Sequence, residues 1–511
     1  MSDVILRAEH IDKSFIGVHA LKDVSVEIRR GEIRCLAGEN GSGKSTFVKT
    51  VSGVYASDAG DIYLNGRHYA RLTPTQAMQE GVQVIYQDLA LFQHMTLAEN
   101  IAINKLRQLG RKTIKWDEVY RIAKAQTDRI GITMDLNATV METSMANRQL
   151  TAICRALALD AKVLFMDEPT TALTRQEVDN LLKVVLELKR AGLAIVFISH
   201  KLDEVFRVAD WITVFRDGAK VGDFEASSID QKKLAYYMTG REVEYPKYRR
   251  AGGDDAPLLE LRHLSKAGNY QDISLNVRHG DILGITGLLG SGRTELALSL
   301  FGLNPPDSGE ILFEGKPVAI HSPNAAKKIG IALLPEDRAT EGMFHSRSIL
   351  QNLSSAIIDE LSRGFAIDRE REHAHAEESV KRLGVRTPSV ETPIGALSGG
   401  NQQKAIIAKW AGTNPKLFIM DTPTVGVDIG SKAEIYEMIQ SFAAAGMAVI
   451  MITDELEELL ANANRVMVMA EQRCVAQFEE ADLAREDIAR VIADLIGDAG
   501  AGAAGKAGDR A

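Results

Sequence analysis

The segment Gly38-Glu-Asn-Gly-Ser-Gly-Lys44-Ser45 decides the fold of this chain. It fits the pattern G-x-x-x-x-G-K-[ST] at every fixed position. A strand-like run, EIRCLA, precedes it at 32–37, and a helical run, STFVKTVSG, follows it at 45–53. Glycines in such a loop let backbone N–H groups curl around phosphate oxygens, and the following helix presents its positive end to them. The stretch predicts a phosphate-binding loop in an α/β fold, against the alternative of a glycine-rich turn with an unrelated lysine.

The residues around this loop predict a nucleotide and Mg²⁺ as its ligands. Lys44 can neutralise β- and γ-phosphate charge, and Ser45 can ligate Mg²⁺. The apolar strand VLFM ends in Asp167, which suits Mg²⁺ binding, and Glu168, which suits polarising an attacking water. His200 follows another apolar strand and could contact the γ-phosphate. Strand-end carboxylates more often cap loops and a lone histidine is usually structural, but the phosphate loop favours the functional interpretation. The candidate nucleotide-binding residues of the loop are Gly38, Glu39, Asn40, Gly41, Ser42, Gly43, Lys44, Ser45 and Thr46.

An internal repeat predicts two copies of one domain. The run from Gly31, GEIRCLAGENGSGKST, matches the run from Gly280, GDILGITGLLGSGRTE, at an offset of 249 residues. Further on, VLFMDEPTTALT matches LFIMDTPTVGVD through Asp167 and Asp421, at an offset of 254. Short apolar runs alternate with helical patterns in each copy, which predicts parallel-sheet α/β cores, and residues 117–130 predict a helix of a helical subdomain. The predicted segments are a first domain at 1–241, a linker at 242–257, a second domain at 258–496 and a disordered Ala/Gly-rich tail at 497–511.

Composition excludes several classes of protein. The 511 residues carry a net charge of −9, which argues against a surface that coats nucleic acid. The three cysteines are far apart and form no zinc or redox spacing, so a reducing compartment is expected. The N-terminus has no signal-peptide pattern, and no window approaches 18 uninterrupted apolar residues. We therefore expect a chain that does not cross a membrane by itself.

The ordered set of motifs resembles an ATP-binding cassette, specifically the duplicated cassettes of bacterial sugar importers. The resemblance rests on Phe15, GENGSGKST, Gln87 in VIYQD, MDEPTTALT and ISHK in the first copy. In the second copy it rests on GLLGSGRTE, LLPEDRATEG and the full signature LSGGNQQK at 397–404. It implies two tandem P-loop nucleotide-binding domains, each with a RecA-like core and a helical signature subdomain. In the family the two domains are arranged head to tail, and ATP with Mg²⁺ binds between the P-loop of one and the signature of the other.

The same resemblance assigns further roles. Phe15 would stack on adenine, and Gln87 would serve catalysis and Mg²⁺. The signature residues would reach the γ-phosphate held by Lys44, and the second phosphate loop would bind a second nucleotide. These residues are Ser398, Gly399, Gly400 and Gln402 in the signature, and Gly287, Gly292, Arg293 and Thr294 in the second loop.

The two predicted sites differ in their chemistry. Between first and second copy the paired residues are Lys44 and Arg293, Gln87 and Glu336, Glu168 and Thr422, and His200 and Asp454. Thr422 cannot act as a carboxylate base, and Asp454 would set negative charge near a γ-phosphate. In the first copy the signature reads TSMANR at 143–148, so Cβ atoms replace both glycines. We expect one competent site and one that binds nucleotide but hydrolyses it poorly.

The predicted function is that of an ATP-hydrolysing subunit of an importer. The resemblance implies a homodimeric membrane permease held near Gln87 and Glu336, an external substrate-binding protein, and peripheral attachment at the cytoplasmic face of the membrane. It implies a monosaccharide such as a pentose or hexose, with a polyol or nucleoside as alternatives. A soluble twin-cassette factor acting on ribosomes or DNA is the rival from another class, and an export ATPase is a second rival. Such a factor would carry a long basic interdomain arm or zinc-binding cysteines, and this chain has neither.

Overall fold

The structure is a computed structural model that describes residues 3–170, 173, 175–199, 201–242, 247–252, 255–288, 290–364 and 366–497. The chain divides into two compact units, Met1–Val243 and Glu244–Ala511. His200 lies outside the described residues, as does the predicted tail beyond Gly497.

A six-stranded sheet forms the centre of the first unit, in the order β10-β9-β3-β8-β7-β6. All neighbours are parallel except β9 and β10, which are antiparallel. Its strands are β3 (Ile33–Ala37), β6 (Val82–Ile85), β7 (Val163–Asp167), β8 (Ala194–Ile198), β9 (Trp211–Arg216) and β10 (Ala219–Glu225). Every residue of β3 and β8 is buried, as expected for parallel strands covered on both faces.

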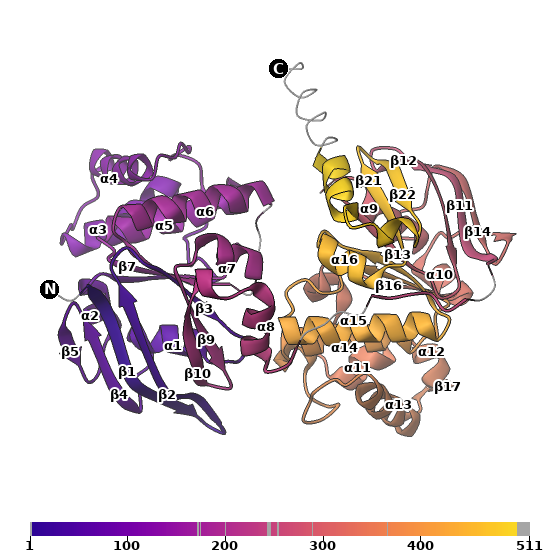
Figure 1. Cartoon of the computed structure of the whole chain (residues 1–511), viewed down its shortest axis with the longest axis horizontal. Helices are drawn as coiled ribbons and strands as arrows, with labels where there is room; N and C mark the ends of the chain where they lie inside the picture. The colour runs from indigo at the N-terminus through magenta and orange to yellow at the C-terminus, as the bar shows by residue number, and fades with distance from the viewer. Residues whose placement is uncertain are drawn as a thin grey trace, which may run out of the picture. The chain divides into compact units, whose positions relative to one another are not determined.

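A second, antiparallel sheet and a group of helices complete the first unit. The antiparallel sheet has the order β2-β1-β4-β5, from β1 (Val4–Phe15), β2 (Val18–Arg29), β4 (Ala59–Leu64) and β5 (Arg67–Tyr69). The helices are α1 (Lys44–Val51), α2 (Pro74–Gln79), α3 (Leu97–Gln108), α4 (Trp116–Arg129), α5 (Met145–Ala158), α6 (Arg175–Arg190), α7 (Leu202–Val208) and α8 (Gln231–Thr239). Helices α3, α4 and α5 lie on the side of the unit away from the antiparallel strands (Figure 1). The helix predicted at 117–130 is confirmed as α4.

The second unit repeats this plan. Its central sheet has the order β16-β19-β20-β13-β21-β22 and its antiparallel sheet β12-β11-β14-β15. The strands are β11 (Pro257–Lys266), β12 (Tyr270–Arg278), β13 (Ile282–Gly287), β14 (Ser308–Phe313), β15 (Lys316–Pro317), β16 (Ile331–Leu334), β19 (Leu417–Asp421), β20 (Ala448–Ile452), β21 (Arg465–Ala470) and β22 (Arg473–Phe478), with a small hairpin of β17 (Ser362–Arg363) and β18 (Ala366–Ile367). The helices are α9 (Arg293–Leu300), α10 (Pro323–Ile329), α11 (Ile349–Ser354), α12 (Ile358–Leu361), α13 (Arg369–Arg382), α14 (Gly399–Ala411), α15 (Ile429–Ala444) and α16 (Leu456–Asn462).

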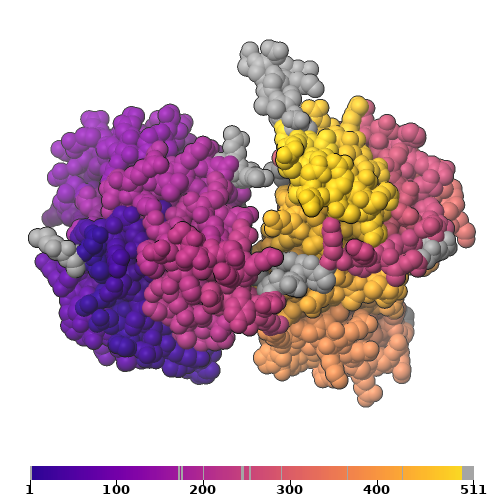
Figure 2. Space-filling view, viewed as in Figure 1, coloured from indigo at the N-terminus to yellow at the C-terminus, as the bar shows by residue number. Residues whose placement is uncertain are grey.

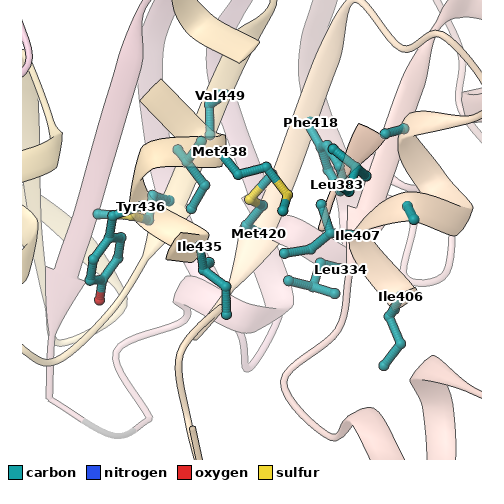
Figure 3. Packing of buried hydrophobic residues seen from close by; sticks show 14 of the residues in the cluster. Leu334, Leu383, Ile406, Ile407, Phe418, Met420, Ile435, Tyr436, Met438 and Val449 are labelled. Atoms are coloured by element: carbon teal, nitrogen blue, oxygen red, sulfur yellow. The ribbon is translucent and has the colours of Figure 1, made fainter. Parts of the chain in front are cut away.

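One apolar cluster joins the sheet of the second unit to its signature helix. Figure 3 shows side chains of this cluster converging from β16, β19, β20, α14 and α15. Ile407 on α14 and Phe418 on β19 are fully buried within it. Because burial of such side chains stabilises by roughly 1.5–3 kcal/mol each, the helix that carries the signature is firmly attached to the core. The helices α3–α5 of the first unit form a continuous part of that unit's surface (Figure 2).

Part of the predicted linker is attached to the second unit. The hydroxyl of Tyr248 donates to the Gly280 carbonyl over 2.8 Å, and Lys247 Nζ donates to the Leu483 carbonyl over 2.8 Å. The backbone N–H of Tyr248 donates to the carbonyl of Ala461 over 3.0 Å. Hence this stretch behaves as the first packed segment of the second unit, ahead of β11.

Candidate nucleotide sites

The loop between β3 and α1 has the geometry of a phosphate cradle. Gly38 has φ 152° and Gly43, which precedes α1, has φ 106°. A Cβ at Gly38 would lie 2.3 Å from the Phe215 carbonyl oxygen, and one at Gly43 would lie 2.7 Å from the Ala20 carbonyl oxygen. Both positions therefore require glycine, for their conformation and for the close approach of the neighbouring backbone.

Lys44 lies inside this loop. Its Nζ donates to the carbonyl of Gly38 over 2.7 Å and to that of Glu39 over 2.9 Å. The side chain is buried, whereas Asn40, Gly41 and Ser45 are exposed at the mouth of the loop. A buried cation within a glycine-rich loop at the start of a helix suits a polyphosphate, because loop and helix N–H groups can bind phosphate oxygens.

The predicted carboxylates lie at the same edge of the sheet. Asp167 ends β7 and pairs in register with Ile198, the last residue of β8. Burial raises the pKa of the Asp167 carboxyl, as does the adjacent charge of Glu168, while the Lys44 cation lowers it. Glu168 has φ 46°, the left-handed region, and its N–H donates to the Ile198 carbonyl over 2.9 Å. A non-glycine residue in this conformation costs of order 1 kcal/mol or more, and such strain gathers at functional sites.

Two other predicted residues lie on loops of the first unit. Gln87 is exposed just beyond the end of β6. Because β6 pairs in parallel with β7, Gln87 lies at the same edge of the sheet as Asp167, which ends β7. Phe15 ends β1 with 42% of its surface exposed, and its ring meets that of Tyr55 edge to face, 5.1 Å between centroids. Tyr55 was missed in the sequence, where the only signal was an aromatic residue shortly after the phosphate-loop helix.

The signature of the second unit requires both of its glycines. A Cβ at Gly399 would lie 2.8 Å from the Gly426 carbonyl oxygen, and one at Gly400 would lie 2.3 Å from Ser431 Oγ. Ser398 precedes α14, and its Oγ accepts a hydrogen bond from Asn401 Nδ2 over 2.9 Å. Gln402 Nε2 donates back to the Leu397 carbonyl over 3.0 Å.

The matching segment of the first unit is arranged differently. Ser144 caps α5, because its Oγ accepts from the Asn147 N–H over 3.3 Å. Arg148, at the position of Gln402, folds back and donates Nε to the carbonyls of Val140 and Thr143, over 2.9 Å and 3.0 Å. Met145, which replaces the first glycine, is exposed. The serine hydroxyl at the start of this helix is therefore engaged by its own backbone.

The second phosphate loop keeps the backbone of the first. Gly287 has φ 155° and Gly292 has φ 93°, and a Cβ at Gly287 would lie 2.0 Å from the Met469 carbonyl oxygen. Leu289 in this loop lies outside the described residues. At its end Thr294 Oγ1 donates to Asp421 Oδ2 over 2.7 Å. The loop and its carboxylate are thus joined by a direct hydrogen bond.

Charge in this second site is balanced by a pair that the sequence did not reveal. Arg293 Nη1 forms a short hydrogen-bonded ion pair with Asp454. Asp454 is expected from the sequence to set negative charge near a γ-phosphate, and in the structure this charge is paired with the Arg293 guanidinium. Burial raises the pKa of Asp421 to about 6, with a further contribution from Glu336.

Thr422 reproduces the backbone of Glu168 without its carboxylate. Its φ is 45°, and its N–H donates to the Ile452 carbonyl over 2.9 Å. The buried Oγ1 of Thr422 has no hydrogen-bond partner within the described part of the chain, and neither has the buried Oγ of Ser291. Two buried hydroxyls without partners near one phosphate loop mark a polar interior that an ordered water can satisfy.

Comparison with known proteins decides the family. The sequence profile of the ABC transporter family matches residues 21–171 and 270–425. The chain belongs to the ABC transporter family. It is 42% identical over 486 residues, 95% of this chain and 92% of the other, to an import ATP-binding protein of Pseudomonas syringae pv. tomato, provisionally named for ribose, galactose and methyl galactoside. It is 40% identical over 495 residues, 96% of this chain and 98% of the other, to the galactofuranose transporter ATP-binding protein of Escherichia coli K12. A crystal structure of a nucleotide-free ATP-binding cassette from an ABC transporter is 26% identical with a TM-score of 0.40, covering 43% of this chain and 91% of that one.

The predicted fold class and enzyme class are confirmed. The family profile occurs twice, once in each unit, on an α/β core with a helical part. Members of this family are ATP hydrolases, so the chain is an ABC-type ATPase. Among the helices of the described ranges, none has the length and apolar character needed to span a membrane.

Proposed function

We propose that this chain drives the import of a monosaccharide, a pentose or hexose, by hydrolysing ATP in its first unit. The observation that carries the proposal is the phosphate cradle around Lys44 with Asp167 and Glu168 at the adjoining strand edge. Relatives named for ribose, galactose and galactofuranose transport, similar over nearly the whole chain, support the substrate class.

The partners follow from the importer proposal. The chain would bind a homodimeric membrane permease through the loops that carry Gln87 and Glu336, both of which are exposed. Through the permease it would serve an external sugar-binding protein and lie peripherally at the cytoplasmic face of the membrane. It would bind no nucleic acid, consistent with its net charge of −9.

The residues of the first unit fit ATP and Mg²⁺. Lys44 and the loop N–H groups would hold the β- and γ-phosphates, with Phe15 under the adenine. Ser45, Gln87 and Asp167 offer the oxygen ligands that Mg²⁺ prefers, and the metal would neutralise charge on the phosphates. Glu168 would orient and polarise the attacking water, with His200 proposed as a further γ-phosphate contact.

We further propose that Ser398, Gly399, Gly400 and Gln402 act on the nucleotide bound by the first P-loop. The first unit cannot supply this contact from its own kind of segment, because Ser144 there caps its helix and Met145 replaces a glycine. The second P-loop, with Gly287, Gly292, Arg293 and Thr294, would hold nucleotide without rapid turnover, because Thr422 has no carboxylate.

A matched pair of variants tests this division of labour. Glu168→Gln should lower ATP hydrolysis by the assembled transporter by at least about 10²-fold, the range that a general base contributes. Thr422→Val, at the same backbone position of the second unit, should leave hydrolysis within about twofold. Abundant hydrolysis in Glu168→Gln would refute the proposal, and a large loss in Thr422→Val would show that the second unit also turns over.

A further inference from the structure

The two phosphate loops are alike, but the places where a base would rest differ. Two corresponding aspartates fix the alignment of the hairpins beside the loops. In the first unit Asp58 accepts from Lys13 Nζ over 2.7 Å and from the Ser14 N–H over 2.6 Å. In the second unit Asp307 accepts from Lys266 Nζ over 2.9 Å and from the Ala267 N–H over 2.8 Å.

This alignment places Gly268 where the first unit has Phe15. The second hairpin is also shorter, because Lys266 pairs with Tyr270, whereas its counterpart Lys13 pairs with the more distant Leu21. Gly268 has φ +76°, and a Cβ added there would meet nothing within 4 Å. The second unit therefore has no side chain at the position of Phe15, and the space next to the Gly268 backbone is open.

The second ring is missing as well. Tyr55, whose ring meets that of Phe15 edge to face, corresponds to Asn304. Each of these two residues follows the phosphate-loop helix of its unit, and its backbone N–H donates to the carbonyl at the matching position of that helix. Asn304 Nδ2 donates to Asn269 Oδ1 over 2.8 Å, so an amide bonded to the neighbouring hairpin stands where the first unit has the Tyr55 ring. The exposed aliphatic residue beside them is common to both units, Val54 in the first and Leu303 in the second. Among the described Phe, Tyr and Trp side chains of the second unit, Phe344 is the one more than a third exposed, and it lies before α11.

The phosphate half of the second site is nevertheless built. Its glycines keep the conformations of the first loop, Thr294 is bonded to Asp421, and the hydroxyls of Ser291 and Thr422 are buried without partners. Arg293 is 8% exposed and forms its ion pair with Asp454, whose side chain is 65% exposed. A phosphate can take the place of so exposed a carboxylate and engage the guanidinium through two hydrogen bonds.

We propose that the second unit binds a magnesium triphosphate through its phosphates alone, so that the base adds no affinity. The inference deepens the proposed function and rests on it in two respects, that the second phosphate loop binds nucleotide and that Phe15 lies under the adenine in the first unit. A base stacked on an aromatic ring contributes roughly 1–3 kcal/mol. The first unit should therefore prefer ATP to inorganic tripolyphosphate by about 5- to 150-fold, and the second should bind both alike.

Calorimetry of the full chain with two probes, Mg·ATP and Mg·tripolyphosphate, tests the inference. Lys44→Ala leaves the second unit to be measured, and Arg293→Ala leaves the first. In Lys44→Ala the two dissociation constants should agree within about threefold, whereas in Arg293→Ala ATP should bind at least about fivefold tighter. A tenfold preference for ATP in Lys44→Ala, or no binding of either probe, overturns the inference.

A third variant keeps the test independent of loop damage. Phe15→Ala removes an exposed ring and leaves both phosphate loops intact. Combined with Arg293→Ala, it should weaken ATP binding to the first unit at least about fivefold and leave tripolyphosphate unchanged. Equal weakening of the binding of both probes would contradict a separate binding place for the base. Failure of the proposed function would appear differently, as absence of ATP binding in Arg293→Ala itself.

Discussion

Lys44 and Arg293 stand at the same position of two copies of one loop, yet they face different partners. Lys44 donates to the carbonyls of Gly38 and Glu39 within its own loop. Arg293 instead bonds to Asp454, which follows a strand end and is 161 residues further along the sequence. The longer, planar guanidinium can reach a carboxylate outside the loop, whereas the lysine ammonium is a compact charge that fits within the loop. Two of the residues that distinguish the second site, Arg293 and Asp454, are thus in direct contact.

Loop glycines give a first residue-scale prediction. Gly38→Ala should abolish nucleotide binding by the first unit, because its Cβ would lie 2.3 Å from a backbone oxygen. Gly41→Ala should cost about 1 kcal/mol, or roughly fivefold in affinity, since a Cβ there meets nothing within 4 Å and only its φ of 82° is strained. Titration of both variants with Mg·ATP checks this, and equal effects would contradict the geometry of the cradle.

The buried carboxyl of Asp421 gives a pH prediction. Its folded-state pKa of about 6 lies above the ordinary 3.8, so protonation favours the folded state. The cost in stability grows between about pH 4 and pH 6 and is constant at higher pH. In EDTA, Asp421→Asn should raise the free energy of unfolding of the second unit by up to ~3 kcal/mol at pH 8 and by about half of that at pH 5.

Denaturation followed by Trp410 fluorescence, in a background with Trp116 and Trp211 replaced by phenylalanine, isolates the second unit. Asp359→Asn, at a side chain that is 88% exposed, is the control and should change nothing. A stabilisation by Asp421→Asn that grows as the pH falls would have the wrong sign for this account.

At the scale of elements, sequence pattern predicted what is local. The phosphate loops, the strands that end in Asp167 and Asp421, and helix α4 follow from spacing within a few residues. Contacts between distant elements could not be predicted this way. The Phe15–Tyr55 pair joins a hairpin to the residues after α1, and the orphaned hydroxyl of Thr422 depends on what surrounds it. Periodicity reports which face of an element is buried, and it carries no information on which partner is met there.

Arg338 shows how such contacts organise the signature. Its Nη1 donates to the Val425 carbonyl over 2.9 Å and its Nη2 to the Gly426 carbonyl over 3.2 Å. The guanidinium also lies against Gly399 at the start of α14, since a Cβ there would be 2.9 Å from Nη2. One side chain after β16 therefore holds the loop after β19 beside the signature helix.

Removing this clamp gives the element-scale prediction. Arg338→Ala should lower kcat of the assembled transporter about tenfold with little change in KM for ATP, because the signature loses its position while the first P-loop is untouched. Arg338→Lys should be intermediate, since an ammonium cannot hold two carbonyls in the same fork. Arg363→Ala, at a side chain that is 76% exposed, is the control. A rise in KM at unchanged kcat would contradict the assigned role.

At the scale of the whole molecule, the two units have diverged in complementary ways. The first has Glu168 and the Phe15–Tyr55 ring pair but lacks both signature glycines. The second has Gly399 and Gly400 but has Thr422, with Gly268 and Asn304 in place of the two rings. Duplication alone would give two equal sites, and random decay would not sort the losses so consistently. The pattern fits a chain in which one unit hydrolyses ATP and the signature of the other completes that site, as proposed.

The measurement that tests the central claim most directly is uptake in a strain from which this gene is deleted. The strain is complemented with either the native chain or Glu168→Gln and is offered a panel of labelled sugars, polyols and nucleosides. We expect uptake of one monosaccharide to be lost in the deletion strain, restored by the native chain and not restored by Glu168→Gln. Restoration by Glu168→Gln would contradict hydrolysis by the first unit, and unchanged uptake across the panel in a strain without redundant transporters would contradict the importer itself.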